Sequence, residues 1–259
     1  MKFRPCIDIH NGKVKQIVGG SLSDKDNFAL DNFVSDRDAG YYARLYKERG
    51  LHGGHVIILN KEGSAYYPEC KRQAFGALEA FDGGLQIGGG INDKNAEDFL
   101  NAGASHVIVT SYVFSGGSFN LDNLKRLAAV TGKERLVLDL SCRKKGDDYY
   151  IVTDRWQKFT PVKVTLSTLG TLAEYCDEFL VHAVDVEGKA LGIERGLAAL
   201  LGSYRGLPVT YAGGIASFED IETLRELGNG RLDFTVGSAL DIFGGNLDFD
   251  KVAGKRSTS

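Results

Sequence analysis

Two aspartates stand at the ends of apolar segments in opposite halves of the chain. Asp8 ends the run Pro-Cys-Ile-Asp, and Asp139 ends the run Leu-Val-Leu-Asp. A carboxylate among buried apolar residues costs free energy unless it is paired, protonated or functional. Two facing carboxylates can act as general base and general acid if their surroundings separate their pKa values. Asp8 and Asp139 are therefore candidate catalytic residues, with loop capping as the alternative for each.

A glycine motif occurs twice, half a chain apart. Residues 88–91 read Gly-Gly-Gly-Ile and residues 212–215 read Ala-Gly-Gly-Ile. Each motif follows a short apolar run and precedes an amphipathic helix pattern, after which a second apolar run stops at small residues. Glycines let backbone N–H groups approach an anion, and a helix N-terminus adds a favourable dipole. The two motifs together predict a small-molecule substrate with two phosphates.

Other candidate site residues lie in polar segments between the apolar runs. Trp156, the one tryptophan of the chain, suits stacking on a heteroaromatic ligand, with anchoring of its own loop as the alternative. His182 could donate to a ligand or be a satisfied core histidine. Asp185 and Glu187 could orient the substrate or a catalytic carboxylate, and loop hydrogen bonding is an equal alternative for Glu187.

Several site classes lack their signatures in this sequence. There is no HExxH metal motif and no GxSxG nucleophile motif, and residues 88–90 lack the wider dinucleotide-binding fingerprint. The four cysteines form no CxxC pair, which predicts free and mostly buried thiols in a reducing compartment.

Eight apolar runs alternate with helical patterns. Most of the runs are continuously apolar, as is typical of strands covered on both faces. Asn92 or Asp93 is expected to cap the third helix, and Ser217 with Asp220 forms a capping-box pattern. The long segments 11–35 and 141–161 are expected to be functional loops. The predicted strands are 3–9, 55–59, 85–87, 106–110, 135–140, 178–182, 209–211 and 233–236, and the predicted helices are 36–50, 71–81, 93–103, 121–132, 169–176, 193–206 and 217–228.

Repeated strand–helix units require a parallel sheet with right-handed crossovers. Eight units without a linker favour a closed (βα)8 TIM barrel, which needs about 250 residues. The offsets between the two aspartates, the two glycine motifs and the two later runs are nearly equal, which indicates an internal half-barrel duplication. We predict a single α/β domain over residues 1–253, with halves 1–132 and 133–253, and a disordered tail at 254–259.

Composition excludes several classes of partner. The 259 residues carry a net charge of −3 without a basic stripe, which disfavours nucleic acid. No apolar run reaches membrane-spanning length, so no membrane contact is expected. The first predicted strand begins at Phe3 and leaves no room for a targeting segment, from which we expect a cytoplasmic protein.

Taken together, these motifs resemble one family over nearly the whole chain, the phosphoribosylformimino-aminoimidazole carboxamide ribonucleotide isomerases of histidine biosynthesis. The segment 182–188, His-Ala-Val-Asp-Val-Glu-Gly, is most similar to the eukaryotic-type branch. The resemblance implies a (βα)8 barrel with duplicated halves, no metal or cofactor, and a monomer. It also implies an Amadori rearrangement, in which an aminoaldose on one phosphoribosyl arm becomes an aminoketose.

The resemblance also implies roles for individual residues. Asp8 would be the base that removes the proton from ribose C2′, and Asp139 the acid that helps to open the ring. Trp156 is similar to a loop tryptophan that stacks on substrate, and His182 and Asp185 would contact substrate. One phosphate would be held by Gly89, Gly90, Thr110 and Ser111, and the other by Gly213, Gly214, Gly237 and Ser238.

The chain departs from the commoner bacterial pattern at a few auxiliary positions: Gln16, Asn60, Asn92 and Ala183. Two alternatives follow. One is the cyclase subunit of imidazole glycerol phosphate synthase, a sister barrel with two opposed aspartates, although its usual sixth-strand motif is missing here. The other is a phosphate-binding barrel that binds without catalysing a reaction.

Overall fold

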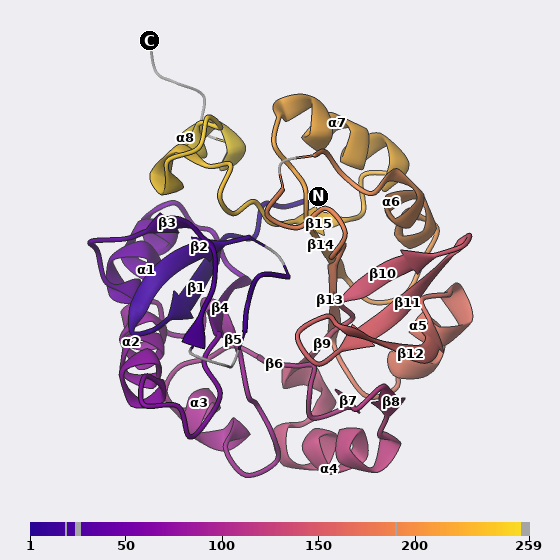
Figure 1. Cartoon of the computed structure of the whole chain (residues 1–259), viewed down its shortest axis with the longest axis horizontal. Coiled ribbons are helices and arrows are strands. Elements are labelled where there is room, and N and C mark those ends of the chain that lie inside the picture. The colour runs from indigo at the N-terminus through magenta and orange to yellow at the C-terminus, as the bar shows by residue number, and fades with distance from the viewer. Residues whose placement is uncertain (19, 24–26, 190, 255–259) are drawn as a thin grey trace.

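The computed structural model describes residues 1–18, 20–23, 27–189 and 191–254. Its largest element is a curled ten-stranded sheet with helices on its outer side (Figure 1). Eight strands run parallel and pair in the order β15-β14-β13-β9-β6-β5-β4-β1. All eight were predicted, and they are β1 (Cys6–His10), β4 (Gly54–Ile58), β5 (Leu85–Gly88), β6 (Val107–Val109), β9 (Leu136–Asp139), β13 (Glu178–His182), β14 (Val209–Ala212) and β15 (Asp233–Phe234).

The last parallel strand lies beside the segment that precedes the first. Phe3 forms a parallel bridge with Phe234 of β15. The Arg4 N–H donates to the Phe234 carbonyl at 2.8 Å, and the Phe234 N–H donates to the Lys2 carbonyl at 3.0 Å. The Arg4 guanidinium also pairs with Asp233 at 2.8 Å and with Glu178 of β13 at 3.2 Å. The N-terminal segment is thereby joined to both β13 and β15.

The predicted helices are present, with bounds that differ by a few residues from the predicted ones. The capping box of Ser217 and Asp220 is confirmed at α7. The cap predicted for α3 is wrong, because that helix begins after Asn95, and the Asn92 side chain instead accepts from the Lys94 N–H within the preceding turn. The helices are α1 (Ala39–Glu48), α2 (Tyr67–Ala80), α3 (Ala96–Asn101), α4 (Leu121–Thr131), α5 (Leu166–Leu172), α6 (Arg195–Gly202), α7 (Phe218–Leu227) and α8 (Phe249–Val252), with short 3-10 helices η2 (Lys133–Arg135) and η3 (Asp241–Phe243).

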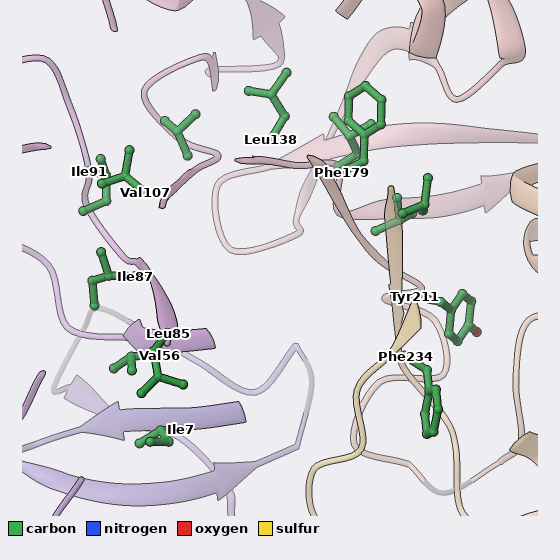
Figure 2. Close-up of a cluster of buried hydrophobic side chains, with 14 of the residues drawn as sticks. Ile7, Val56, Leu85, Ile87, Ile91, Val107, Leu138, Phe179, Tyr211 and Phe234 are labelled. Carbon is green, nitrogen blue, oxygen red and sulfur yellow. The ribbon is translucent and has the colours of Figure 1, made fainter. Parts of the chain in front are cut away.

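The alternation of side chains along the strands divides the core into two clusters. The larger cluster joins every parallel strand to the helices, from Ile7 on β1 to Phe234 on β15 (Figure 2). Because successive strand residues face opposite sides, Asp8 faces away from Ile7, and Asp139 faces away from Leu138. Their side of the sheet holds the smaller cluster, which consists of Ile108, Val137, Leu180 and Ala212.

Both long segments predicted to be loops contain strands. Segment 11–35 includes β2 (Lys13–Ile17) and β3 (Asp31–Val34), which extend the sheet antiparallel from β1. Segment 141–161 falls within a separate antiparallel sheet made of β10 (Cys142–Lys145), β11 (Asp148–Thr153) and β12 (Lys158–Lys163). A short hairpin, β7 (Phe114–Ser115) with β8 (Ser118–Phe119), follows β6.

The sequence analysis also made predictions about the C-terminal tail and about membrane contact. Of the predicted disordered tail, residues 255–259 lie outside the described residues. Within the described part of the chain, no helix is both long and apolar enough to cross a membrane.

Candidate active site

The two candidate catalytic aspartates, Asp8 at the middle of β1 and Asp139 at the last residue of β9, face the same side of the sheet. Asp8 lines a pocket beside His55, His182 and Glu187. The same pocket is lined by four of the predicted phosphate-binding residues, which are Gly213, Gly214, Gly237 and Ser238. The structure thus brings together one carboxylate and one complete predicted phosphate site.

Asp139 is held by three side-chain donors. The Ser141 hydroxyl donates to Oδ1 at 2.9 Å, the Thr110 hydroxyl donates to Oδ2 at 3.0 Å, and Nδ1 of His182 lies 3.1 Å from Oδ1. Burial of Asp139 alone would raise its pKa, but the positive charge of His182 and these hydrogen bonds outweigh burial and lower the pKa. Asp139 is therefore ionised at neutral pH.

The pKa of Asp8 is shifted in the opposite direction. Burial raises its pKa to about 7, the carboxylate of Glu187 adds to that effect, and the nearby His182 partly opposes it. A carboxylate whose pKa lies near the working pH is suited to accept and return a proton during one turnover. The surroundings of the two candidate aspartates therefore shift their pKa values in opposite directions, which suits different roles in acid–base catalysis.

His182 interacts with both aspartates, by a hydrogen bond with Asp139 and electrostatically with Asp8. Burial would lower its pKa, but the charge and hydrogen bond of Asp139, together with the charges of Glu187 and Asp8, raise the pKa to about 9. The neighbouring ring of His55 lies 6.4 Å away between centroids, and burial lowers the pKa of His55 to about 3. At neutral pH the pocket therefore contains one imidazolium, His182, and one neutral imidazole, His55.

The sequence left two interpretations of Glu187 open, which were orientation of the substrate or of a catalytic carboxylate, and loop hydrogen bonding. In the structure Glu187 lines the pocket that holds Asp8. Its Oε2 is buried and has no hydrogen-bond partner among the described residues. Burial raises its pKa, which the nearby His182 partly opposes. An unpaired buried carboxylate oxygen beside Asp8 is an acceptor that a bound ligand can satisfy.

The two glycine motifs share one backbone conformation. Gly89 and Gly213 directly follow β5 and β14 with φ of 102° and 120°, and Gly90 and Gly214 follow with φ of 72° and 76°. Such values strongly favour glycine. The first motif lies at the ends of the adjacent strands β5 and β6 with Thr110 and Ser111, outside the lining of the pocket that holds Asp8. The Thr110 hydroxyl is already engaged by Asp139.

The turn between β11 and β12 brings Trp156 close to His182, although Trp156 is not among the residues that line the pocket of Asp8. Its ring centroid is 6.2 Å from that of His182, with the ring planes tilted by 37°. Asp154, Arg155 and Trp156 have φ of 54°, 60° and 67°. This left-handed conformation costs about 1–2 kcal/mol for each non-glycine residue. The turn is held by the Asp154–Lys158 ion pair at 2.8 Å.

Asp185, like Asp139, Trp156 and the first glycine motif, lies outside the lining of the pocket that holds Asp8. Its carboxylate accepts from Nε of Arg143 at 2.8 Å and from the Lys144 N–H at 2.9 Å. Asp185 thereby fastens β10 of the small antiparallel sheet to the segment that follows β13. In the structure it supports the strands that carry Trp156.

Comparison with known proteins agrees with this architecture. Residues 2–247 match the family described as histidine biosynthesis protein. A chloroplastic enzyme of Medicago truncatula is 56% identical over 256 residues, which cover 97% of this chain and 80% of that protein. Enzymes of Neurospora crassa and Saccharomyces cerevisiae are 47% and 46% identical over 247 and 253 residues, covering 94% and 95% of this chain and 93% and 94% of theirs.

All three relatives carry the same enzyme name, 1-(5-phosphoribosyl)-5-((5-phosphoribosylamino)methylideneamino) imidazole-4-carboxamide isomerase. The similarity spans both candidate aspartates, both glycine motifs and the segment between β13 and α6. The chain belongs to the histidine biosynthesis protein family.

Proposed function

We propose that this chain is the isomerase of histidine biosynthesis that converts a bis-phosphorylated aminoaldose, the phosphoribosylformimino-aminoimidazole carboxamide ribonucleotide, into the corresponding aminoketose. The relatives carry the name of this enzyme over almost the full length of the chain. The observation that carries the proposal is the pocket itself. A carboxylate suited to act as a base, Asp8, lies there beside a glycine motif and beside His182, whose Nδ1 is 3.1 Å from Asp139.

The proposed chemistry is an Amadori rearrangement by acid–base catalysis. A general acid at the hydrogen-bonded pair of Asp139 and His182 protonates the ring oxygen, and the C1′–O bond breaks as the substrate nitrogen forms a C1′=N bond. Asp8 removes the proton from C2′, giving an enolamine, and returns a proton to C1′ as C2′ becomes a ketone. Proton transfer by a positioned side chain contributes about 10²–10⁴-fold to such rates. No metal or cofactor takes part in this scheme.

The proposed substrate contacts follow the two glycine motifs. One phosphate binds the backbone N–H groups at Gly213, Gly214, Gly237 and Ser238, which line the pocket that holds Asp8. The other binds at Gly89, Gly90, Thr110 and Ser111. Because the Thr110 hydroxyl donates to Asp139, its backbone N–H is the group left for the phosphate. Trp156 stacks on the heteroaromatic part of the substrate, and Asp185 acts by holding the strands that carry Trp156.

The finer fold proposed here is a closed (βα)8 barrel with duplicated halves at 1–132 and 133–253. The hydrogen bonds of Phe234 with Lys2 and Arg4 support closure between β15 and the chain before β1. The equal conformations of Gly89 and Gly213 support the duplication, since each directly follows a strand in its own half. We further propose a monomer, which light scattering after gel filtration tests.

The cytoplasm is the proposed compartment, on the ground that all four cysteines are buried free thiols. The Medicago truncatula relative is named as chloroplastic, and a plastid is the alternative for this chain. Imaging of the complete gene product fused to a fluorescent protein distinguishes the two.

The first experiment is an isomerase assay on the purified protein. The substrate is supplied with EDTA, and the absorbance change is followed with excess cyclase–glutaminase as the coupling enzyme. We expect turnover in the wild type, and a loss of about 10²–10⁴-fold in kcat with little change in KM for Asp8→Asn. Normal kcat in Asp8→Asn would overturn the assignment of the base.

The same preparation distinguishes the alternatives if no turnover is found. Consumption of the aminoketose with ammonia would indicate the cyclase. Tight binding of the aminoaldose by calorimetry, without consumption of either compound, would indicate a binding protein.

A further inference from the structure

Asp139 is poorly suited to give a proton directly to a substrate. Both of its carboxylate oxygens are occupied by donors within the protein, Oδ2 by Thr110 and Oδ1 by Ser141 and His182. Its pKa is lowered, so it carries no proton at neutral pH. It also lies behind His182 and is absent from the lining of the pocket that holds Asp8.

His182 has the opposite properties. It lines the pocket, and its Nδ1 is committed to Asp139, so Nε2 is the ring nitrogen that can donate to a bound molecule. The ring of Trp156, the proposed stacking residue, lies 6.2 Å from the imidazole. A substrate stacked on Trp156 would therefore lie close to the His182 imidazolium.

We propose that the proton that opens the ribose ring is carried on Nε2 of His182, and that Asp139 is a positioning residue that acts through His182. This inference rests on the proposed isomerase reaction and assigns the atom that supplies the acid. The role of Asp139 is then to hold the imidazole in place and to keep it charged, as a carboxylate beside a catalytic histidine does.

The protons balance over one turnover. Nε2–H of His182 passes to the ring oxygen, the electron pair of the C1′–O bond goes to that oxygen, and the nitrogen lone pair forms C1′=N. Asp8 takes the C2′ proton, the C2′–H electron pair forms C1′=C2′, and the π pair of C1′=N returns to the nitrogen. As the ketone forms, the 2′-hydroxyl proton returns to His182 and the proton on Asp8 goes to C1′. Both residues end in their starting protonation states, and no external oxidant or reductant is needed.

The charged groups around His182 predict a pH window for this reaction. Burial lowers the pKa of His182, but Asp139 of β9, Glu187 of the segment after β13 and Asp8 of β1 outweigh burial and raise the pKa to about 9. His55 of β4 also faces His182, and its lowered pKa of about 3 leaves it neutral over this range. Asp8 must be ionised to act as base, and its pKa is about 7. Activity should therefore follow a bell with an acidic limb near 7 and a basic limb near 9, as apparent values of coupled groups.

The pH dependence of kcat/KM in three variants tests the assignment. His182→Gln should lower kcat by about 10²–10⁴-fold, leave KM within a few fold and abolish the basic limb. Asp139→Asn should keep a basic limb but move it at least one pH unit lower, because His182 loses its counter-charge. The matched control is His106→Gln, which removes another histidine with an aspartate partner, Asp177 at 3.4 Å, away from the pocket, and should leave the profile unchanged.

The opposite pattern would overturn the inference. If Asp139 itself is the donor, Asp139→Asn abolishes the basic limb and His182→Gln retains it. Long-range ¹H–¹⁵N spectra of the histidine rings provide a readout independent of turnover, in which the His182 signals should titrate near pH 9 and at lower pH in Asp139→Asn. Absence of turnover in the wild type would refute the proposed function, whereas turnover with an unchanged basic limb in His182→Gln would refute this inference alone.

Discussion

Gly89 and Gly213 occupy equivalent positions in the two halves of the chain, one residue beyond β5 and one residue beyond β14. A Cβ atom on Gly89 would lie 2.1 Å from the carbonyl oxygen of Ile58, and one on Gly213 would lie 2.8 Å from that of Ala183. In both places a strand-end carbonyl closes the space in which a side chain would begin. This repeated contact explains why the motif tolerates only glycine at its second position.

Gly213→Ala should therefore weaken substrate binding and stability together. The left-handed φ costs about 1 kcal/mol for a non-glycine residue, and relief of the contact with Ala183 must move the backbone that is proposed to bind phosphate. We expect a KM at least tenfold higher and a lower midpoint in thermal unfolding. Gly230→Ala is the control, since Gly230 has φ of 66° with open space around it. Equal effects of the two changes on KM would argue against a phosphate site at Gly213.

Much of the fold could be predicted from sequence because burial on both faces leaves a plain signal. All eight parallel strands were found, and β13 was predicted with its observed bounds. The missed strands are antiparallel and partly exposed, so their pattern is less apolar. The sequence did contain one signal for β2, because the pair Asn11-Gly12 is typical of a tight hairpin turn. In the structure these two residues lie between β1 and β2 with φ of 51° and 76°.

The candidate site was predicted less completely than the fold. The residue types and strand-end positions of Asp8 and Asp139 were visible, but the properties that separate them are set by neighbours distant in sequence. The three donors to Asp139 come from the residue after β6, the segment after β9, and β13. The approach of Trp156 to His182 depends on a small sheet that the sequence did not predict.

Asp8 should make stability depend on pH in an unusual direction. Its pKa rises from 3.8 to about 7 on folding, so between these values the folded state binds more protons than the unfolded state. Its contribution is therefore most favourable below pH 4 and declines as pH rises to 7, by at most about 4 kcal/mol. Asp8→Asn removes this loss, and its stability relative to the wild type should grow between pH 4 and 8. Denaturant unfolding at several pH values measures the difference, and a constant difference would show that Asp8 has an ordinary pKa.

Arg4 should be essential for the junction between the N-terminal segment and the sheet. Its guanidinium pairs with Glu178 and Asp233, and the side chains of all three are largely buried. Removal of one partner from a buried ion pair typically costs about 3–5 kcal/mol, because the remaining charges are left uncompensated. We expect a loss of this size for Arg4→Met in urea unfolding. Arg225→Met, which breaks an exposed pair with Glu222, should cost less than about 1 kcal/mol.

Trp156 offers a direct spectroscopic report on the site because it is the one tryptophan of the chain. If it stacks on the heteroaromatic part of the substrate, binding must change the surroundings of its indole and hence its fluorescence. We expect a saturable change when the aminoketose product is added, with a midpoint that rises at least tenfold in Gly213→Ala. Trp156→Phe should keep most of the affinity, since a phenyl ring can still stack, whereas Trp156→Ala should lose about 1–2 kcal/mol of binding free energy. A wild-type emission spectrum that stays constant at saturating product, with binding confirmed by calorimetry, would assign Trp156 to anchoring its own turn instead.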